Sequence, residues 1–456
     1  MSEGNGNPRL RRTITLWGAL AFVVGAVIGA GIFVLIAPIA EGAGAAIWLA
    51  FLIAMFVSLA GTIPIIQLAG AIPRAGAGFF FASRLLGPMA GVVTSALFVL
   101  AGVLATCVVA LGLAEYTLNY ISLPLGVHLT GGVILIIFFG LYHLGMRFAI
   151  GLQAIMALQL IGALLLYGVV GFLHADVAIS LSPPRGWGAF AMAVLLCYNT
   201  CLGFQVLAEL GEEVHHAKRT IPLALLLGGA IVGGLYILVA VTFVSLVPYD
   251  ASLYESLTAP LDYTSRMFLS SPLATFVGIG AIAAGVTSLN AAAVALPREF
   301  FSAARDGMLP DWFQRIDRRT HSPMNAVLAF FAASLAVLLL RVDLETYGLG
   351  AALGIQSSTA IVAIASLRLR RLFPDEYATA YIRFPRPLLW GCAGFTLLAS
   401  VGFVGVVAME KPGLLMAYGA VAAASIGYYL VRTRRMTQAG VAWRDTLKRI
   451  PVCDDE

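Results

Sequence analysis

The stretch Gly25-Ala26-Val27-Ile28-Gly29-Ala30-Gly31-Ile32-Phe33 lies in the middle of the first apolar segment, residues 14–40. Its three glycines would cost a helix roughly 1 kcal/mol each, and lipid leaves the polar groups of an irregular backbone unpaired. A break here is expected only where it is buried in protein and lines a cavity. Freed N–H groups of such a break can bind a carboxylate, as in half of the substrate site of a secondary transporter. The alternative is close helix packing, because Gly25 and Gly29 also form a G-x-x-x-G pair.

The composition indicates a membrane protein. Of the 456 residues, 60% are hydrophobic and 11% are charged, and the mean hydropathy is +0.93, whereas a soluble domain carries about a quarter charged residues. The net charge of +5 comes from basic residues in short loops, so we expect a lipid bilayer and no nucleic acid as a partner. The N-terminus has no cleavage-site pattern, so we expect the first apolar segment to be retained.

Twelve apolar segments have about the length that a membrane crossing needs, close to 20 residues. They are residues 14–40, 44–71, 88–120, 129–146, 150–173, 188–211, 222–248, 272–301, 324–341, 346–368, 388–409 and 413–431. With the N-terminus in the cytoplasm, only four of the 28 lysines and arginines fall outside, namely Arg185, Arg266, Arg341 and Lys411. Because basic loops face the cytoplasm, the sequence predicts twelve transmembrane helices with both termini cytoplasmic.

The sixth segment repeats the irregularity of the first. Its centre carries Tyr198, Asn199, Thr200, Gly203 and Gln205, and polar residues at membrane depth predict a second break that faces a cavity. Segments 1 and 6 correspond if segments 1–5 and 6–10 are inverted repeats, and paired broken helices at such positions indicate a transport site. The expected layout is a tail at 1–13, a transport core at 14–368, two further helices in 369–432 and a tail at 433–456.

Four stretches together resemble the amino acid–polyamine–organocation (APC) superfamily of permeases, which has the LeuT-type fold. They are GAVIGAGIF at 25–33, IPRAGAGF at 72–79 with SRLLGP at 83–88, GF at 203–204 with EEV at 212–214 and RTIP at 219–222, and RDGMLP at 305–310 with SPMNA at 322–326. The resemblance runs from about Leu16 to Leu430. It implies an all-α integral membrane fold of a 5+5 inverted repeat plus two C-terminal helices, with helices 1 and 6 discontinuous. It also implies a bacterial inner-membrane amino acid transporter that works by alternating access.

The resemblance carries family roles onto residues of this chain. The substrate carboxylate would meet the backbone of residues 28–31, its amino group would meet carbonyls near Ala26 and Cys197–Cys201, and Phe204 would cover the ligand. The expected substrate-binding residues are Ala26, Ile28, Gly29, Ala30, Gly31, Cys197, Thr200, Cys201, Phe204 and Gln205. The alternative for Cys197 and Cys201, and the one the sequence favours, is a packing role.

The cargo is expected to be a neutral amino acid. Cationic substrates favour intramembrane carboxylates as partners, but Gln205 stands where many relatives carry an acid, and Glu115 lies near the outer end of its segment. The alternative is a polyamine, amine or cationic amino acid exchanger of the same superfamily.

The coupling ion is open between Na⁺ and H⁺, and we expect no other cofactor. Proton-coupled relatives often carry a lysine in helix 5, where this chain has Leu160 and no lysine in 150–173. Three possibilities remain. The hydroxyls of Thr287 and Ser288 bind Na⁺, the substrate is exchanged without an ion, or Glu209 or His143 carries a proton. The hydroxyls of Thr287 and Ser288 can instead bond to their own helix, and His143 can make a structural hydrogen bond.

Charged residues of the cytoplasmic loops form a candidate inner gate, comprising Arg74, Glu213, Arg219 and Arg305. Exposed ion pairs contribute less than about 1 kcal/mol each, so their expected role is to bias one conformation. A channel or a membrane enzyme is disfavoured, because no repeated pore segment and no clustered nucleophile, base or metal set is evident, and the six histidines are dispersed. The assembly is expected to be a monomer or a homodimer.

Overall fold

The computed structural model describes residues 10–29, 31–121, 124–176, 179–257 and 259–440. These residues form helices and connecting turns with two isolated β-bridges and no strand, which confirms the all-α class. The α-helices are α1 (Leu16–Val27), α2 (Gly31–Ala43), α3 (Ile47–Ala71), α4 (Ala77–Leu85), α5 (Pro88–Tyr120), α6 (Val127–Tyr142), α7 (Met146–His174), α8 (Gly186–Thr200), α9 (Ala217–Leu246), α10 (Ala251–Ser256), α11 (Pro260–Ser265), α12 (Ser271–Ala295), α13 (Pro297–Arg305), α14 (Met324–Leu338), α15 (Leu344–Ser366), α16 (Leu369–Leu372), α17 (Pro374–Thr379), α18 (Arg386–Glu410) and α19 (Pro412–Gln438). Three short 3₁₀ helices complete the list: η1 (Gly44–Ala46), η2 (Phe204–Leu207) and η3 (Asp311–Gln314).

Each of the twelve apolar segments contains a helix, and two of these helices stop near their middle. The first segment divides into α1 and α2, and the sixth is helical only to Thr200. Within the described ranges, nine helical stretches are long and apolar enough to cross a membrane, and α1, α6 and α14 are shorter apolar helices. The number of crossings and the inverted repeat stay predictions. The eighth segment continues past α12 into α13, whose first residue is Pro297, a residue that fits the start of a helix.

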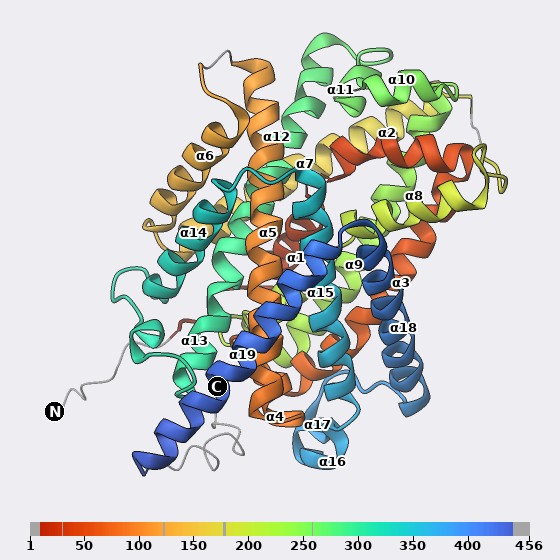
Figure 1. The fold of residues 1–456 in the computed structure, drawn as a ribbon. Helices are drawn as coiled ribbons and strands as arrows, with labels where there is room; N and C mark the ends of the chain where they lie inside the picture. The colour runs from red at the N-terminus through yellow and green to blue at the C-terminus, as the bar shows by residue number, and fades with distance from the viewer. Residues whose placement is uncertain (1–9, 30, 122–123, 177–178, 258, 441–456) are drawn as a thin grey trace.

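The bundle has a packed centre and a lipid-type periphery. In Figure 1, α5 and α15 run side by side through the centre, while α6 and α14 lie together at one edge. Large side chains such as Phe22, Phe33, Tyr167 and Tyr236 are fully buried between the helices. By contrast, only 6% of the most apolar 18-residue stretch of α19 is buried inside the structure. This helix therefore presents its apolar surface outward, as a lipid-facing helix does.

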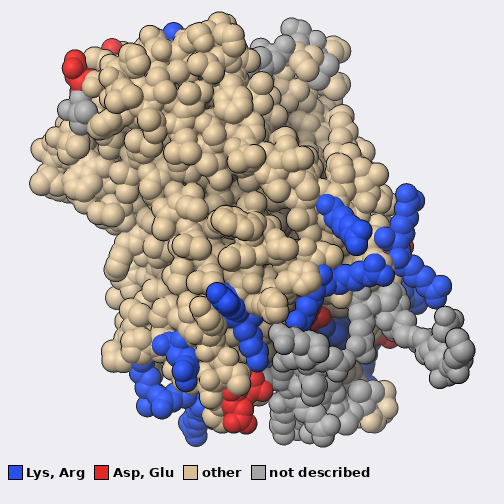
Figure 2. All heavy atoms as spheres, turned by 180° about the vertical axis from the view of Figure 1, so that it is seen from behind, with Lys and Arg blue, Asp and Glu red and all other residues tan. Residues whose placement is uncertain are grey.

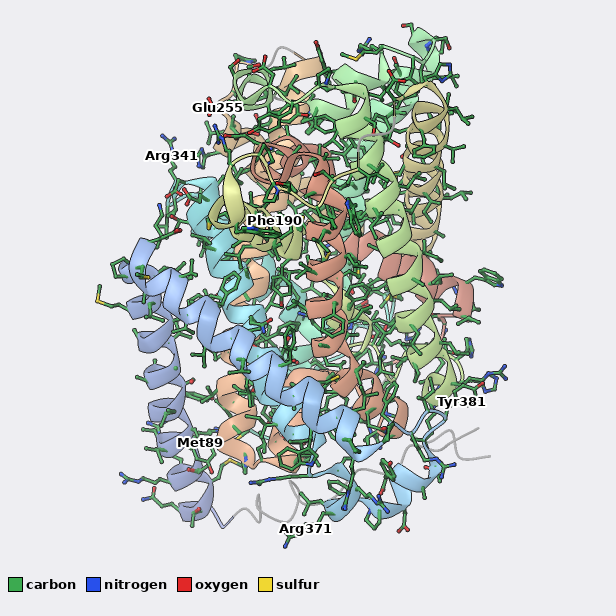
Figure 3. All side chains as sticks on the ribbon, turned by 90° about the vertical axis from the view of Figure 1, so that its right-hand side faces the viewer. Met89, Phe190, Glu255, Arg341, Arg371 and Tyr381 are labelled. Atoms are coloured by element: carbon green, nitrogen blue, oxygen red, sulfur yellow. The ribbon has the colours of Figure 1, made fainter. Side chains whose placement is uncertain are left out.

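Charge separates the two ends of the bundle. Helices α10 and α11 lie at one end, here named the α10 end, and α16 and α17 lie at the other, the α16 end (Figure 1). Figure 2 shows lysines and arginines gathered toward the α16 end and a nearly uncharged surface over the rest of that face. Glu255 and Arg341 lie at the α10 end, whereas Arg371 and Tyr381 lie at the α16 end (Figure 3).

Candidate functional site

The first break lies between Val27 and Gly31. The Ile28 N–H still donates to the Val24 carbonyl at 2.8 Å, but the Gly29 N–H turns back to the Val27 carbonyl at 2.8 Å. Ala30 lies outside the described residues. The first N–H groups of any helix lack intrahelical partners, and those at the start of α2 have no hydrogen-bond acceptor among the described residues.

The second break follows Thr200. The Cys201 N–H makes a tight turn to the Tyr198 carbonyl at 2.9 Å, and Gly203 has φ 120°, in the left-handed region where a side chain is strained. The chain then continues as η2 and as turns through Glu213 instead of the predicted helix to residue 211. Gly203 therefore turns the chain between α8 and η2 in a conformation that other residues rarely adopt.

The two breaks touch each other. A Cβ atom added to Gly203 would lie 2.9 Å from the Ala26 carbonyl oxygen. The hydroxyl of Tyr236 in α9 lies 3.1 Å from the Val27 carbonyl oxygen and 3.0 Å from the Thr200 carbonyl oxygen. One fully buried phenol thus links the carbonyl ends of α1 and α8. Sequence reasoning missed Tyr236, because nothing in the seventh apolar segment distinguishes it.

Each glycine of the first break faces a different helix. A Cβ added to Gly25 would lie 2.5 Å from Gln153 Nε2 of α7. A Cβ added to Gly29 would lie 3.1 Å from Ser288 Oγ of α12, and one added to Gly31 would lie 3.1 Å from a methyl group of Thr200. Gly25 therefore serves close packing, and at Gly29 and Gly31 an added side chain would enter the space next to Ser288 and Thr200. The interpretation of the break as a carboxylate site stays a prediction.

Backbone carbonyls of the second break already accept hydrogen bonds from hydroxyls. Thr200 donates to the Cys197 carbonyl at 2.7 Å, and Ser58 of α3 donates to the Cys201 carbonyl at 2.8 Å. Both cysteines are fully buried free thiols. Since a carbonyl oxygen has two lone pairs, each can accept one further hydrogen bond.

Phe204 and Gln205 point away from each other. The Phe204 ring packs toward Gly229 of α9, 3.8 Å from the position of an added Cβ. Gln205 lines a cavity with residues of α3, α4, α5 and α15, and its Nε2 is buried with no hydrogen-bond acceptor in the described part of the chain.

The candidate ion residues differ in what their side chains do. The Thr287 hydroxyl donates to the Ala284 carbonyl of its own helix at 2.9 Å, as the structural alternative required. Ser288 Oγ is buried, has no hydrogen-bond partner among the described residues and faces Gly29. His143 is exposed and hydrogen-bonds the Phe139 carbonyl at 3.0 Å, and Leu160 is fully buried.

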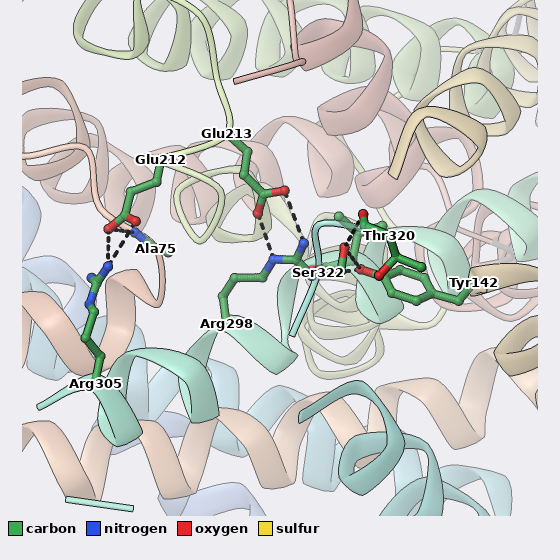
Figure 4. Close-up of polar contacts among 9 residues, drawn as sticks. Ala75, Tyr142, Glu212, Glu213, Arg298, Arg305, Thr320 and Ser322 are labelled. Atoms are coloured by element: carbon green, nitrogen blue, oxygen red, sulfur yellow. Dashed lines mark hydrogen bonds and ion pairs between the residues drawn. The ribbon is translucent and has the colours of Figure 1, made fainter. Parts of the chain in front are cut away.

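Three of the four candidate gate residues belong to two neighbouring groups of ion pairs, here called the gate cluster, at the α16 end (Figure 4). Arg305 contacts both oxygens of Glu212 at 2.8 and 2.9 Å, and Arg298 contacts both oxygens of Glu213 at 2.9 and 3.2 Å. Arg74 lies 3.7 Å from Glu212. These bonds join the loop before α4, the turns after η2 and α13.

The Arg298–Glu213 pair is fully buried. Burial raises the pKa of the Glu213 carboxyl, although the Arg298 guanidinium opposes this rise. Arg298 also donates to the Tyr142 hydroxyl at 3.0 Å and to the Val294 carbonyl of α12. Arg219 lies apart from this cluster, with its guanidinium 5.5 Å from the centre of the Tyr381 ring.

Glu209 is buried, and its Oε1 accepts from the Gly78 N–H at the start of α4 at 3.2 Å. Beside it lies Glu299 of α13, which accepts from the Phe79 N–H at 3.1 Å. Sequence reasoning did not single out Glu299. The signal available was an acid next to Arg298 at the edge of an apolar segment, which also fits an ordinary loop charge.

Comparison with known proteins agrees with this architecture. The profile described as "Amino acid permease" matches residues 14–431. An uncharacterized transporter of Mycobacterium tuberculosis is 28% identical over 412 residues, covering 88% of this chain and 91% of the relative. A branched-chain amino acid permease of Bacillus subtilis is 22% identical, covering 81% of this chain and 83% of the relative. Cationic amino acid transporter 4 of Mus musculus is 25% identical, covering 91% of this chain and 68% of the relative.

The apolar helices, the two facing breaks and these matches define an integral membrane transporter. The chain belongs to the amino acid permease family of the APC superfamily, as its sequence motifs indicated. It is a transporter, not an enzyme, and small-molecule amino acids are the substrates this family implies.

Proposed function

We propose that this protein is a secondary transporter that moves neutral amino acids across the bacterial inner membrane by alternating access. The observation that supports this most is the contact between the two breaks, joined by the Tyr236 hydroxyl at the carbonyls of Val27 and Thr200. Broken helices of this kind concentrate unpaired backbone groups and helix dipoles at one point.

The proposed ligand geometry follows from the direction of the helices. The start of α2 offers free N–H groups and the positive end of a helix dipole, which favour a carboxylate. The carbonyl ends of α1 and α8 offer the negative ends, which favour an ammonium group. An amino acid carries both groups on adjacent atoms, so the two breaks together fit its constant part.

We propose substrates with neutral side chains because, among the described residues of α1, α2 and α8, no acidic side chain faces the breaks. Glu41 lies near the far end of α2 and is ion-paired with Arg185, and Glu115 of α5 is exposed. A cationic or polyamine substrate is the second candidate, since one of the relatives is a cationic amino acid transporter. For such a substrate, the second positive charge would lack a carboxylate near the breaks.

The membrane arrangement is proposed from charge and topology together. The basic α16 end (Figure 2) faces the cytoplasm by the positive-inside rule. In this arrangement twelve helices cross the bilayer, and helices 1–5 and 6–10 form the inverted repeats. The Glu212 and Glu213 ion pairs then close the cytoplasmic side. Na⁺ beside Ser288 and exchange without an ion are two candidate modes of coupling.

Uptake into liposomes tests this function. Purified wild type should take up one or more members of a panel of neutral L-amino acids, and Gly29→Leu should abolish uptake because the new side chain occupies the space beside Ser288. Gly402→Leu is the matched control, since position 402 is exposed and has open space around it. Uptake of no amino acid by the wild type, or equal uptake by both variants, would contradict the proposal.

A further inference from the structure

Two glutamates from distant parts of the chain meet at the start of α4. Glu209 follows η2 and is 2% exposed, and Glu299 lies in α13 and is 0% exposed. Their carboxyl groups bind the N–H groups of adjacent residues, because Gly78 donates to Glu209 and Phe79 donates to Glu299. Gly78 is needed for this approach, because an added Cβ would lie 2.7 Å from Glu299 Oε1.

The hydrogen-bond donors around the pair are shared unequally. Both oxygens of Glu299 lie 3.1 Å from the Phe79 nitrogen, whose N–H they share. Glu209 receives the Gly78 N–H on Oε1, whereas its Oε2 is buried without a donor from the described residues. A proton on Glu209 Oε2 would supply the missing hydrogen bond to Glu299. The N-terminal dipole of α4 then stabilises the one remaining negative charge.

The neighbouring arginines make their ion pairs with other acids. Among the described residues, Arg84 contacts Asp306, Arg298 contacts Glu213, and Arg74 and Arg305 both contact Glu212, so no ion pair with a cation is seen at Glu209 or Glu299. The two histidines of the same loop, His215 and His216, are exposed. Two buried carboxyl groups held at adjacent N–H groups, without an ion-paired cation, disfavour a second negative charge.

A small cavity lies beside Glu209. Its lining also includes Gln205, from the stretch after the second break, and Ser358 and Thr359 of α15. Gln205 Nε2 is buried there without a partner. Glu209 therefore shares one cavity with the unpartnered amide of Gln205.

We propose that Glu209 and Glu299 form a binding site for one proton, which they hold while the α16 end is closed and release when it opens. The inference rests on the proposed function for its transport role. Opening moves the turns after η2 away from α13 and α4, so Glu209 loses its carboxyl partner and gains water. Its O–H bond then breaks, the proton passes to cytoplasmic water, and the carboxylate remains. One proton would accompany each substrate.

Infrared spectroscopy of the purified full-length protein tests the bound proton without any substrate. At neutral pH, the wild type should show the C=O stretching band of a protonated carboxyl that Glu209→Gln lacks. The glutamine can still donate to Glu299, so the variant should fold. Glu255→Gln, at an exposed site of the α10 end (Figure 3), should keep the band. An unchanged band in Glu209→Gln would overturn the site.

Proteoliposomes test the coupling. The probe is the neutral L-amino acid that the wild type takes up best. An inward proton gradient should stimulate uptake by the wild type and by Glu255→Gln, and this stimulation should be lost in Glu209→Gln while exchange persists. Equal stimulation of all three proteins would overturn proton coupling through this pair. Absence of any uptake by the wild type would contradict the proposed transport function, and the infrared result would still decide the proton site.

Discussion

Replacing Tyr236 by phenylalanine removes the hydroxyl that links the two breaks and leaves the ring in place. The Thr200 carbonyl then loses the Tyr236 donor, while the Val27 carbonyl keeps the Gly29 N–H. A buried acceptor without a donor costs about 1–3 kcal/mol. If the breaks relax to avoid this cost, substrate binding has to restore their geometry, and the dissociation constant should rise by about 5- to 150-fold.

The assay compares ligand affinity with stability in purified protein. Affinity is measured by titration with the neutral amino acid that binds the wild type best, and stability by denaturant unfolding. Tyr418→Phe is the matched control, because that buried hydroxyl donates at 2.7 Å to the Gly350 carbonyl, between α19 and α15. We expect both variants to lose stability and only Tyr236→Phe to lose affinity. Wild-type affinity in Tyr236→Phe, with stability reduced as in Tyr418→Phe, would refute the reasoning.

Two further predictions concern the ion and the gate. If Na⁺ drives uptake, Ser288→Ala should weaken the sodium dependence without lowering stability, because the hydroxyl has no partner to lose among the described residues; an unchanged sodium response would exclude this ligand. At the gate, Arg298→Ala should cost about 3–5 kcal/mol of unfolding free energy, because it leaves Glu213 buried without its charge partner. Arg305→Ala, whose side chain is 27% exposed, should cost less than about 1 kcal/mol. Similar losses of unfolding free energy in Arg298→Ala and Arg305→Ala would show that burial does not set the strength of these ion pairs.

Local signals predicted the helix breaks. Glycines at 25, 29 and 31 disfavour a helix by their own conformational freedom, and Gly203 does so with φ 120°. The all-helical class follows from apolar segments whose lengths suit a bilayer. The end of the sixth helix at Thr200 was harder to predict, because the following Phe204–Glu209 stretch is apolar enough to continue a helix and turns only where it meets the other elements.

Contacts between distant segments could not be predicted. Tyr236 joins two carbonyls that precede it by 36 and 209 positions, and nothing in a single apolar helix marks which tyrosine does so. Glu209 was noticed because an acid is costly inside a membrane segment, but its partner Glu299 lies in α13 and looks like a loop charge. Likewise, Arg219 is one loop cation among many, and only the fold separates it from the Glu212 and Glu213 pairs.

The central claim is that the two breaks bind the carboxylate and ammonium groups of an amino acid, and methyl esters test it most directly. Purified protein is titrated with the best-binding neutral L-amino acid and with its methyl ester, which keeps the ammonium and the side chain. The ester cannot accept charge-assisted hydrogen bonds, each contributing about 1.5–3 kcal/mol, so we predict affinity at least about tenfold lower for the ester. Equal affinity for acid and ester would contradict the proposed role of the free N–H groups at the start of α2.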